Sequence, residues 1–187
     1  MILTVLQTIE DDHLRDAVAQ LFGLYHKGML VKANDILHNW HDAEDAVQET
    51  FYKIARNIED FLPVDSQAAK ALIAVYTRNV AINMYNRKKK QNDLFYSKHD
   101  IGEMNLVSDD PDDDVLELII NQETVEALQR AIDSLDDMHR DVIVLKYYYR
   151  KKNMEIADIM SVDVNVINAR VFRAKKKLMI LMKEGRA

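Results

Sequence analysis

The sequence predicts an all-α protein, with two helical domains joined by a flexible acidic linker. Only four of the 187 residues are Gly and two are Pro, so turn-forming residues are scarce. Apolar residues recur at helical spacing through most of the chain. The pattern lapses between Gln91 and Asp114, where the run Ser108-Asp-Asp-Pro-Asp-Asp-Asp is typical of a linker. We therefore expect domains at residues 1–90 and 115–187 and a linker at 91–114.

The first domain is expected to be a bundle of four helices. The periodic stretches that predict them cover residues 14–25, 29–37, 43–58 and 68–85. Asp42 and Ser66 are candidate N-caps for the third and fourth helices, because short polar side chains accept hydrogen bonds from the free N–H groups of a first turn. Pro63 marks the loop between these two helices.

The second domain is expected to end in a helix-turn-helix. Its periodic stretches cover residues 115–135, 138–148, 154–160 and 164–182. Asp136, Asn153 and Asp163 are candidate caps for the last three helices. A tight turn at Ser161 separates the last two, and the small Ala157 allows them to approach closely, as the helix-turn-helix motif requires.

Composition excludes several classes of protein. The absence of Cys excludes a disulfide scaffold, a thiolate metal site and a cysteine nucleophile. There is no basic leader and no run of about 18 apolar residues, so we expect a cytoplasmic protein without a membrane span. Neither a Gly-rich phosphate loop nor a nucleophile with its base is found, so we expect no catalytic residue, no cofactor and no enzyme. His38 and His41 flank Trp40, but without further ligands a metal site is disfavoured.

Charge is distributed unevenly along the chain. The net charge is −6 overall, with −1 over residues 1–99, −12 over 100–139 and +7 over 140–187. A basic segment in an acidic protein predicts a polyanionic partner, and the acidic middle predicts a spacer or shield.

The last predicted helix has two different faces. One is an apolar stripe of Ile167, Val171, Ala174 and Leu178. The other has amides and small groups first and cations behind them, an order that suits reading of base edges and contact with phosphates. The amide of Asn168 can form a bidentate contact with adenine. The alternative is a helical hairpin whose lysines only keep it soluble. The candidate DNA-binding residues here are Asn165, Asn168, Ala169, Arg170, Phe172, Arg173, Lys176 and Lys177.

Two surfaces of the first domain are candidate interfaces. The helix after Asp42 places an acidic face with an aromatic edge opposite its apolar stripe, which suits a basic partner helix, although an acidic first turn also complements the helix dipole. The later helix combines cations, amides and Tyr85, as single-stranded DNA binding requires. Its cations alternatively stabilise only the helix end. The acidic-face candidates are Asp45, Gln48, Glu49 and Tyr52, and the DNA candidates are Arg78, Asn79, Asn83, Arg87 and Lys88.

Several motifs together resemble a known family. Asp136-Asp-Met-His-Arg-Asp-Val-Ile-Val-Leu, Glu155-Ile-Ala and Arg170-Val-Phe-Arg-Ala-Lys-Lys-Lys-Leu resemble the promoter-binding fourth region of sigma-70 family sigma factors. Asp42-Ala-Glu-Asp-Ala-Val-Gln-Glu-Thr-Phe resembles the second region of the extracytoplasmic-function (ECF) group. Thr77-Arg-Asn-Val-Ala-Ile-Asn-Met-Tyr-Asn-Arg-Lys-Lys-Lys is similar to the later helix of that region. The resemblance covers residues 19–90 and 116–183.

The resemblance implies a sigma factor that binds core RNA polymerase. The acidic face would contact the clamp of the largest subunit, the first domain the minus-ten element and the helix-turn-helix the minus-thirty-five element of promoter DNA. The family also includes members with an anti-sigma partner. This chain departs from the family pattern at Ser161, in place of a turn glycine, and at Leu72, where many members carry Trp.

Two other functions stay open from the sequence. One is a helix-turn-helix regulator whose first domain senses a ligand or binds a protein, and the other is an adaptor whose basic tail binds an acidic protein. Residues 42–51 discriminate among them, because only the sigma reading gives their exposed face a required partner.

Overall fold

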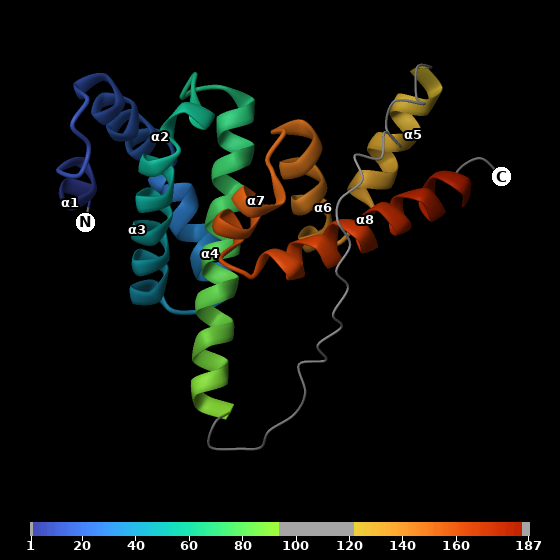
Figure 1. Ribbon diagram of the computed structural model, residues 1–187. Coiled ribbons are helices and arrows are strands. Elements are labelled where there is room, and N and C mark those ends of the chain that lie inside the picture. Colours follow the sequence, from blue (N-terminus) through green and yellow to red (C-terminus); the bar gives the residue numbers. More distant parts are fainter. Residues whose placement is uncertain (1, 94–121, 185–187) are drawn as a thin grey trace. The chain divides into compact units, whose positions relative to one another are not determined.

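The computed structural model describes residues 2–93 and 122–184, which divide into two compact helical units (Figure 1). The first unit contains α1 (Ile2–Leu6), α2 (Asp12–Leu37), α3 (Trp40–Arg56), the 3₁₀ turn η1 (Ile58–Phe61) and α4 (Gln67–Asp93). The second contains α5 (Gln122–Asp133), α6 (Asp137–Ile143), the π-helical turn η2 (Val144–Tyr148), most of α7 (Asn153–Met160) and α8 (Val164–Glu184). Neither described range contains a strand, which confirms the all-α prediction. Beyond its first three residues, the predicted linker lies outside the described residues.

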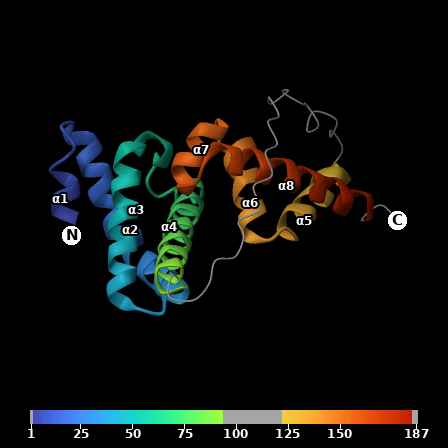
Figure 2. The ribbon, with the colours of Figure 1, turned by 60° about the horizontal axis from the view of Figure 1, so that its bottom comes forward.

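Helices α2, α3 and α4 pack against one another around the core of the first unit (Figures 1 and 2). Phe51 of α3 is 1% exposed, and its ring centroid lies 5.3 Å from that of Phe22 in α2. Phe61 of η1 meets Tyr76 of α4 edge to face, with centroids 5.2 Å apart. Aromatic pairs at such distances attract each other beyond their area burial. The apolar stripe predicted for α3 is thus confirmed as its core face.

Helix α2 runs without a break from Asp12 to Leu37, so the prediction of two helices at 14–25 and 29–37 is wrong. Gly28 lies at the expected break, but glycine keeps the N–H that a helix needs and costs only about 1 kcal/mol relative to alanine. Leu21, Met29 and Ala33 are buried along one face on both sides of it. Packing of this face outweighs the weak local propensity.

Gly28→Ala should raise the free energy of unfolding by about 0.5–1 kcal/mol. Apart from the adjoining backbone of α2 and the two neighbouring residues, no heavy atom lies within 4 Å of the position that the new Cβ would take, so the gain in helix propensity carries no steric penalty. Urea unfolding followed by far-UV circular dichroism measures the effect. Ala33→Gly, at a fully buried position of the same helix, should lower the stability, and a loss for Gly28→Ala would contradict the expectation.

The observed helix ends correct two of the predicted caps. Asn39 caps α3, since its Oδ1 accepts from the backbone N of Asp42 at 3.1 Å. Asp42 therefore lies inside the first turn. Helix α7 begins at Asn153 itself, so Asn153 lies inside the first turn, and Glu155 accepts from the backbone N of the preceding Lys152 at 2.8 Å. The predicted caps Ser66, Asp136 and Asp163 are confirmed, since each side chain accepts a hydrogen bond from the first turn of α4, α6 and α8 respectively.

In the second unit, α8 packs against α5 and α6. The predicted stripe is confirmed, because Ile167, Val171, Ala174 and Leu178 are at most 8% exposed. The helix predicted at 138–148 is α6 continued by the wider turn η2, and of the one predicted at 115–135 the structure describes α5 only. Ser161, where the turn was predicted, has the left-handed φ of 52°.

Candidate nucleic-acid interface

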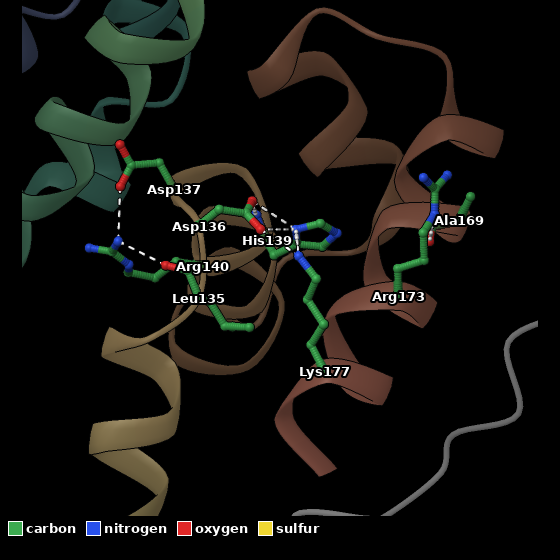
Figure 3. A network of polar contacts seen from close by, with 8 residues as sticks. All are labelled: Leu135, Asp136, Asp137, His139, Arg140, Ala169, Arg173 and Lys177. Carbon is green, nitrogen blue, oxygen red and sulfur yellow. Dashed lines mark hydrogen bonds and ion pairs between the residues drawn. The ribbon is translucent and has the colours of Figure 1, made fainter. Parts of the chain in front are cut away.

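Helix α8 exposes two cations on the face opposite its buried stripe. Arg173 and Lys176 are both exposed, and Lys176 has no ion pair within the described part of the chain. The Nε of Arg173 donates to the carbonyl of Ala169 at 3.2 Å, along its own helix (Figure 3). Phe172 is 60% exposed beside them. These side chains are therefore accessible to a polyanion, as the sequence predicts.

Arg170 is less accessible than Arg173. It is half-buried, and burial lowers the pKa of its guanidinium, with a smaller contribution from the positive charge of Arg173. Arg170 is therefore less open to a phosphate than Arg173.

Two asparagines form a hydrogen bond between the two helices of the helix-turn-helix. Asn153, the first residue of α7, donates from Nδ2 to Oδ1 of Asn168 at 2.7 Å. Asn165 is exposed and Ala169 is half-buried on the same stretch of α8. The sequence predicts a cap at Asn153 and carries no signal for this contact, because a pair 15 residues apart across a turn follows no helical period.

In the first unit, the predicted acidic face and the predicted DNA-binding cations lie beside each other. Asp45 is exposed, whereas Gln48, Glu49 and Tyr52 are partly exposed. The α3 carboxylates pair with α4 cations: Glu49 lies 3.5 Å from Arg87, and Asp42 forms an ion pair with Lys88. The Arg87–Glu49 pair is exposed, and such pairs contribute roughly 0–1 kcal/mol, so a phosphate can compete for Arg87. The partner of Lys88, Asp42, is buried, so Lys88 is less available.

The remaining α4 candidates differ in their access to solvent. Asn79 is 8% exposed and its Nδ2 donates to the carbonyl of Val75 at 2.8 Å. Arg78 and Asn83 are half-buried, whereas Tyr85 is 45% exposed. Leu72, where the family pattern often has Trp, is fully buried in the core. Among these, Tyr85 is the side chain most open to stacking with a base.

His38 has a structural role. It ends α2 with a φ of 53°, and its backbone N–H donates to the carbonyl of Asn34 at 2.8 Å. The residues that the structure describes contain no group of three or more His, Cys, Asp or Glu side chains placed to hold a metal ion.

Two family models match the chain in the order of its two units. The model of sigma-70 region 2 matches residues 21–91, which include α3 and most of α2 and α4. The model of sigma-70 region 4 matches residues 125–178, which include α6, α7 and most of α5 and α8. The chain belongs to the sigma-70 family of RNA polymerase sigma factors. As such it binds core RNA polymerase and directs transcription initiation at promoters.

Similarity to individual proteins places this sigma factor in the ECF group. It is 28% identical to the ECF RNA polymerase sigma factor SigW of Bacillus subtilis (strain 168), over 88% of each chain. It is 25% identical to the RNA polymerase sigma factor YlaC of the same organism, over 92% of this chain and 95% of that one. The structure of the sigma factor RpoE in complex with the anti-sigma factor NepR from Bartonella quintana is 16% identical, covering 88% of this chain and 96% of that one. The TM-score between the two chains is 0.32.

One predicted DNA-binding cation of this sigma factor is engaged within its own unit. The Nζ of Lys177 lies 2.7 Å from Oδ2 of Asp136, and Nδ1 of His139 lies 2.6 Å from the same oxygen (Figure 3). The hydrogen bond from Lys177 is the main cause that holds the pKa of Asp136 below its usual range; partial burial opposes it and His139 adds to it. The pair joins the cap of α6 to α8, so Lys177 is less free for a phosphate than Lys176.

The sigma factor should lose part of its stability when the pH falls below about 4, the ordinary pKa of an aspartate. A carboxyl whose pKa is depressed by folding stabilises the folded state above its unfolded pKa, and this contribution is lost as the pH falls through the folded pKa. Asp136→Asn should therefore flatten the stability profile between pH 2 and 5 in unfolding followed by circular dichroism. Asp133→Asn, at an exposed position near the end of α5, should keep the parent slope. An Asp136→Asn profile as steep as the parent's would contradict the assignment.

Proposed function

We propose that this sigma factor directs initiation at a small set of promoters, using one unit for each promoter element. The observation that carries the proposal is that the region 2 and region 4 matches fall on separate units of one chain, in family order. The linker at 91–114 would tether the two domains, at 1–90 and 115–187. The alternatives, a ligand-sensing regulator and an adaptor, leave the region 2 match without a role.

The DNA contacts are proposed on α8 and α4. On α8, residues of the first turns would read base edges, and the cations behind them would contact phosphates. On α4, the cations and Asn83 would bind the minus-ten strand, with a phosphate replacing the carboxylate of Glu49 at Arg87. The base-reading group is Asn165, Asn168 and Ala169, with Phe172 on the following turn; the phosphate group is Arg170, Arg173, Lys176 and Lys177; the α4 group is Arg78, Asn83, Arg87 and Lys88. Asn79, predicted from the sequence to contact DNA, is buried and bonded to its own helix and is left out of this group.

The polymerase contact is proposed on the exposed face of α3. Its residues Asp45, Gln48, Glu49 and Tyr52 lie outside the buried stripe, and their charge suits a basic helix of the clamp. Because core polymerase acts in the bacterial cytoplasm, we place the sigma factor there as well. Its own role is one of binding, and the polymerase supplies the catalysis.

Transcription from a mixed library of genomic fragments tests the function. Core RNA polymerase with the full-length sigma factor should yield transcripts from defined start sites that core polymerase alone does not yield. Recovery of the protein with core polymerase at moderate salt should accompany this activity. Stable DNA binding without any association with core polymerase would contradict the proposal and favour the regulator.

Arg173→Ala should weaken promoter binding about equally for all sequences and reduce the salt slope of the affinity by roughly 1, because one fewer counterion is released. The measurement is the affinity of the holoenzyme for promoter duplex over a series of salt concentrations. Lys183→Ala removes the same charge at an exposed position near the end of α8, outside the proposed contacts. Equal slopes for the two variants would place Arg173 away from the DNA.

A further inference from the structure

The amide of Asn168 is held by a residue outside the recognition helix. Asn153 begins α7, and its Nδ2 donates to Oδ1 of Asn168 at 2.7 Å. Asn153 is the first residue of α7, and Lys152, whose backbone N donates to Glu155, precedes the helix, so the side chain of Asn153 is not at the cap position. It is free to lie against α8.

Burial fixes the direction of this hydrogen bond. Oδ1 of Asn153 is buried and has no hydrogen-bond partner among the described residues. If the two amides were turned over, Nδ2 of Asn153 would occupy that place and bury N–H donors without an acceptor, which native structures tolerate less well than an unpaired carbonyl. Asn153 is therefore the donor and Asn168 the acceptor.

This hydrogen bond directs Oδ1 of Asn168 toward α7, and the N–H groups of Nδ2, on the other side of the planar amide, are the part turned away from α7 that can be offered to DNA. A bidentate contact with adenine needs both an acceptor for N6 and a donor for N7. Guanine instead presents two acceptors, O6 and N7, in the major groove, whereas cytosine presents a donor. The contact with Asn153 thus changes the base that the sequence alone suggests for Asn168.

We propose that Asn153 is a positioning residue that orients the amide of Asn168 as a hydrogen-bond donor, so that this sigma factor selects guanine rather than adenine at one position of the upstream promoter element. The inference rests on the proposed function, in which α8 reads that element. Asn153 itself acts through Asn168 and makes no contact with the base.

The test is a selection of bound promoter sequences by holoenzyme made with the full-length chain, from a library randomised over the upstream element. Asn168→Ala identifies the position that Asn168 reads, because preference is lost only there. The parent should prefer guanine at that position by about tenfold over adenine, the size of one good base contact. Adenine as the preferred base of the parent would overturn the proposal.

Two variants of Asn153 test the orientation directly. Asn153→Asp keeps the shape but can only accept, so Nδ2 of Asn168 should turn toward it and Oδ1 toward the groove, where it pairs with the N4 donor of cytosine or the N6 donor of adenine. Asn153→Ala frees the amide, and adenine should gain at that position. Both should leave the other positions unchanged.

Met154→Ala is the matched control, since its side chain is the next in α7, is 73% exposed and has no polar group. It should keep the parent preference at every position. An unchanged guanine preference in Asn153→Asp, with circular dichroism showing an intact fold, would overturn the inference while leaving the sigma function standing. Absence of any selected sequence with the parent would instead overturn the proposed promoter recognition, and the inference with it.

Discussion

A chain that carries both Asp45→Lys and Glu49→Lys should stay folded and bind core RNA polymerase about 10- to 100-fold more weakly. Both residues lie outside the buried stripe of α3, so the core is not disturbed. Each reversal replaces an attraction to a basic partner with a repulsion, worth about 1 kcal/mol per exposed contact, and roughly 1.4 kcal/mol is a factor of ten in affinity. Holoenzyme formation and circular dichroism are to be measured on the same samples.

The controls separate docking from general charge effects. Asp16→Lys with Asp35→Lys makes the same change in net charge at exposed positions of α2 and should leave core binding intact. Asp45→Lys alone removes the complication that Glu49 also pairs with Arg87. A folded double variant that assembles normally would show that this face is not the polymerase contact.

Phe51→Ala should lower the free energy of unfolding of the first unit by about 3–5 kcal/mol, the range for a large aromatic side chain removed from a core. Phe51 is 1% exposed and contacts the ring of Phe22, so the substitution leaves a cavity and removes an aromatic pair. Since whole domains are stable by only about 5–15 kcal/mol, the variant is expected to be partly unfolded at physiological temperature. Denaturant unfolding of the full chain measures the loss.

Phe172→Ala is the matched control, because Phe172 is 60% exposed on α8. Exposed substitutions usually change stability by no more than about 0.5 kcal/mol. A loss below 1 kcal/mol for Phe51→Ala would mean that the core of the first unit rearranges around the missing ring.

Local patterns predicted the burial of individual helices well. The stripes of α3 and α8 follow directly from the period of the apolar residues, which reports which face of a helix is buried. The side-chain caps at Ser66, Asp136 and Asp163 involve residues within one turn, so the sequence also predicts them correctly. The cap of α3 was misplaced because Asp42 and Asn39 are both good capping residues, and only the backbone decides which of them precedes the helix.

Contacts between helices were not predictable from the same patterns. The pairs Asn153–Asn168, Asp136–Lys177 and Glu49–Arg87 bring together residues 15 to 41 positions apart. No period connects such residues, so their meeting depends on how the helices pack. Helix periodicity thus predicts Arg87, Lys177 and Asn168 as candidate contact residues. The ion pairs and the amide contact that limit how these side chains can bind DNA are visible only in the tertiary structure.

The distribution of glycine in this protein has a consequence for its evolution and engineering. Both glycines in the described residues, Gly23 and Gly28, lie inside α2, whereas the left-handed backbone positions are filled by His38, Arg150 and Ser161. Glycine in a helix and a side chain at a positive φ are each unfavourable by about 1 kcal/mol. Stabilising substitutions that natural selection has not made are therefore available at these positions. Gly28 and His38 are not assigned to DNA or polymerase binding. Replacing Gly28 with a helix-forming residue and His38 with glycine would raise the stability of the fold, and this gain could offset destabilising changes made to alter promoter specificity.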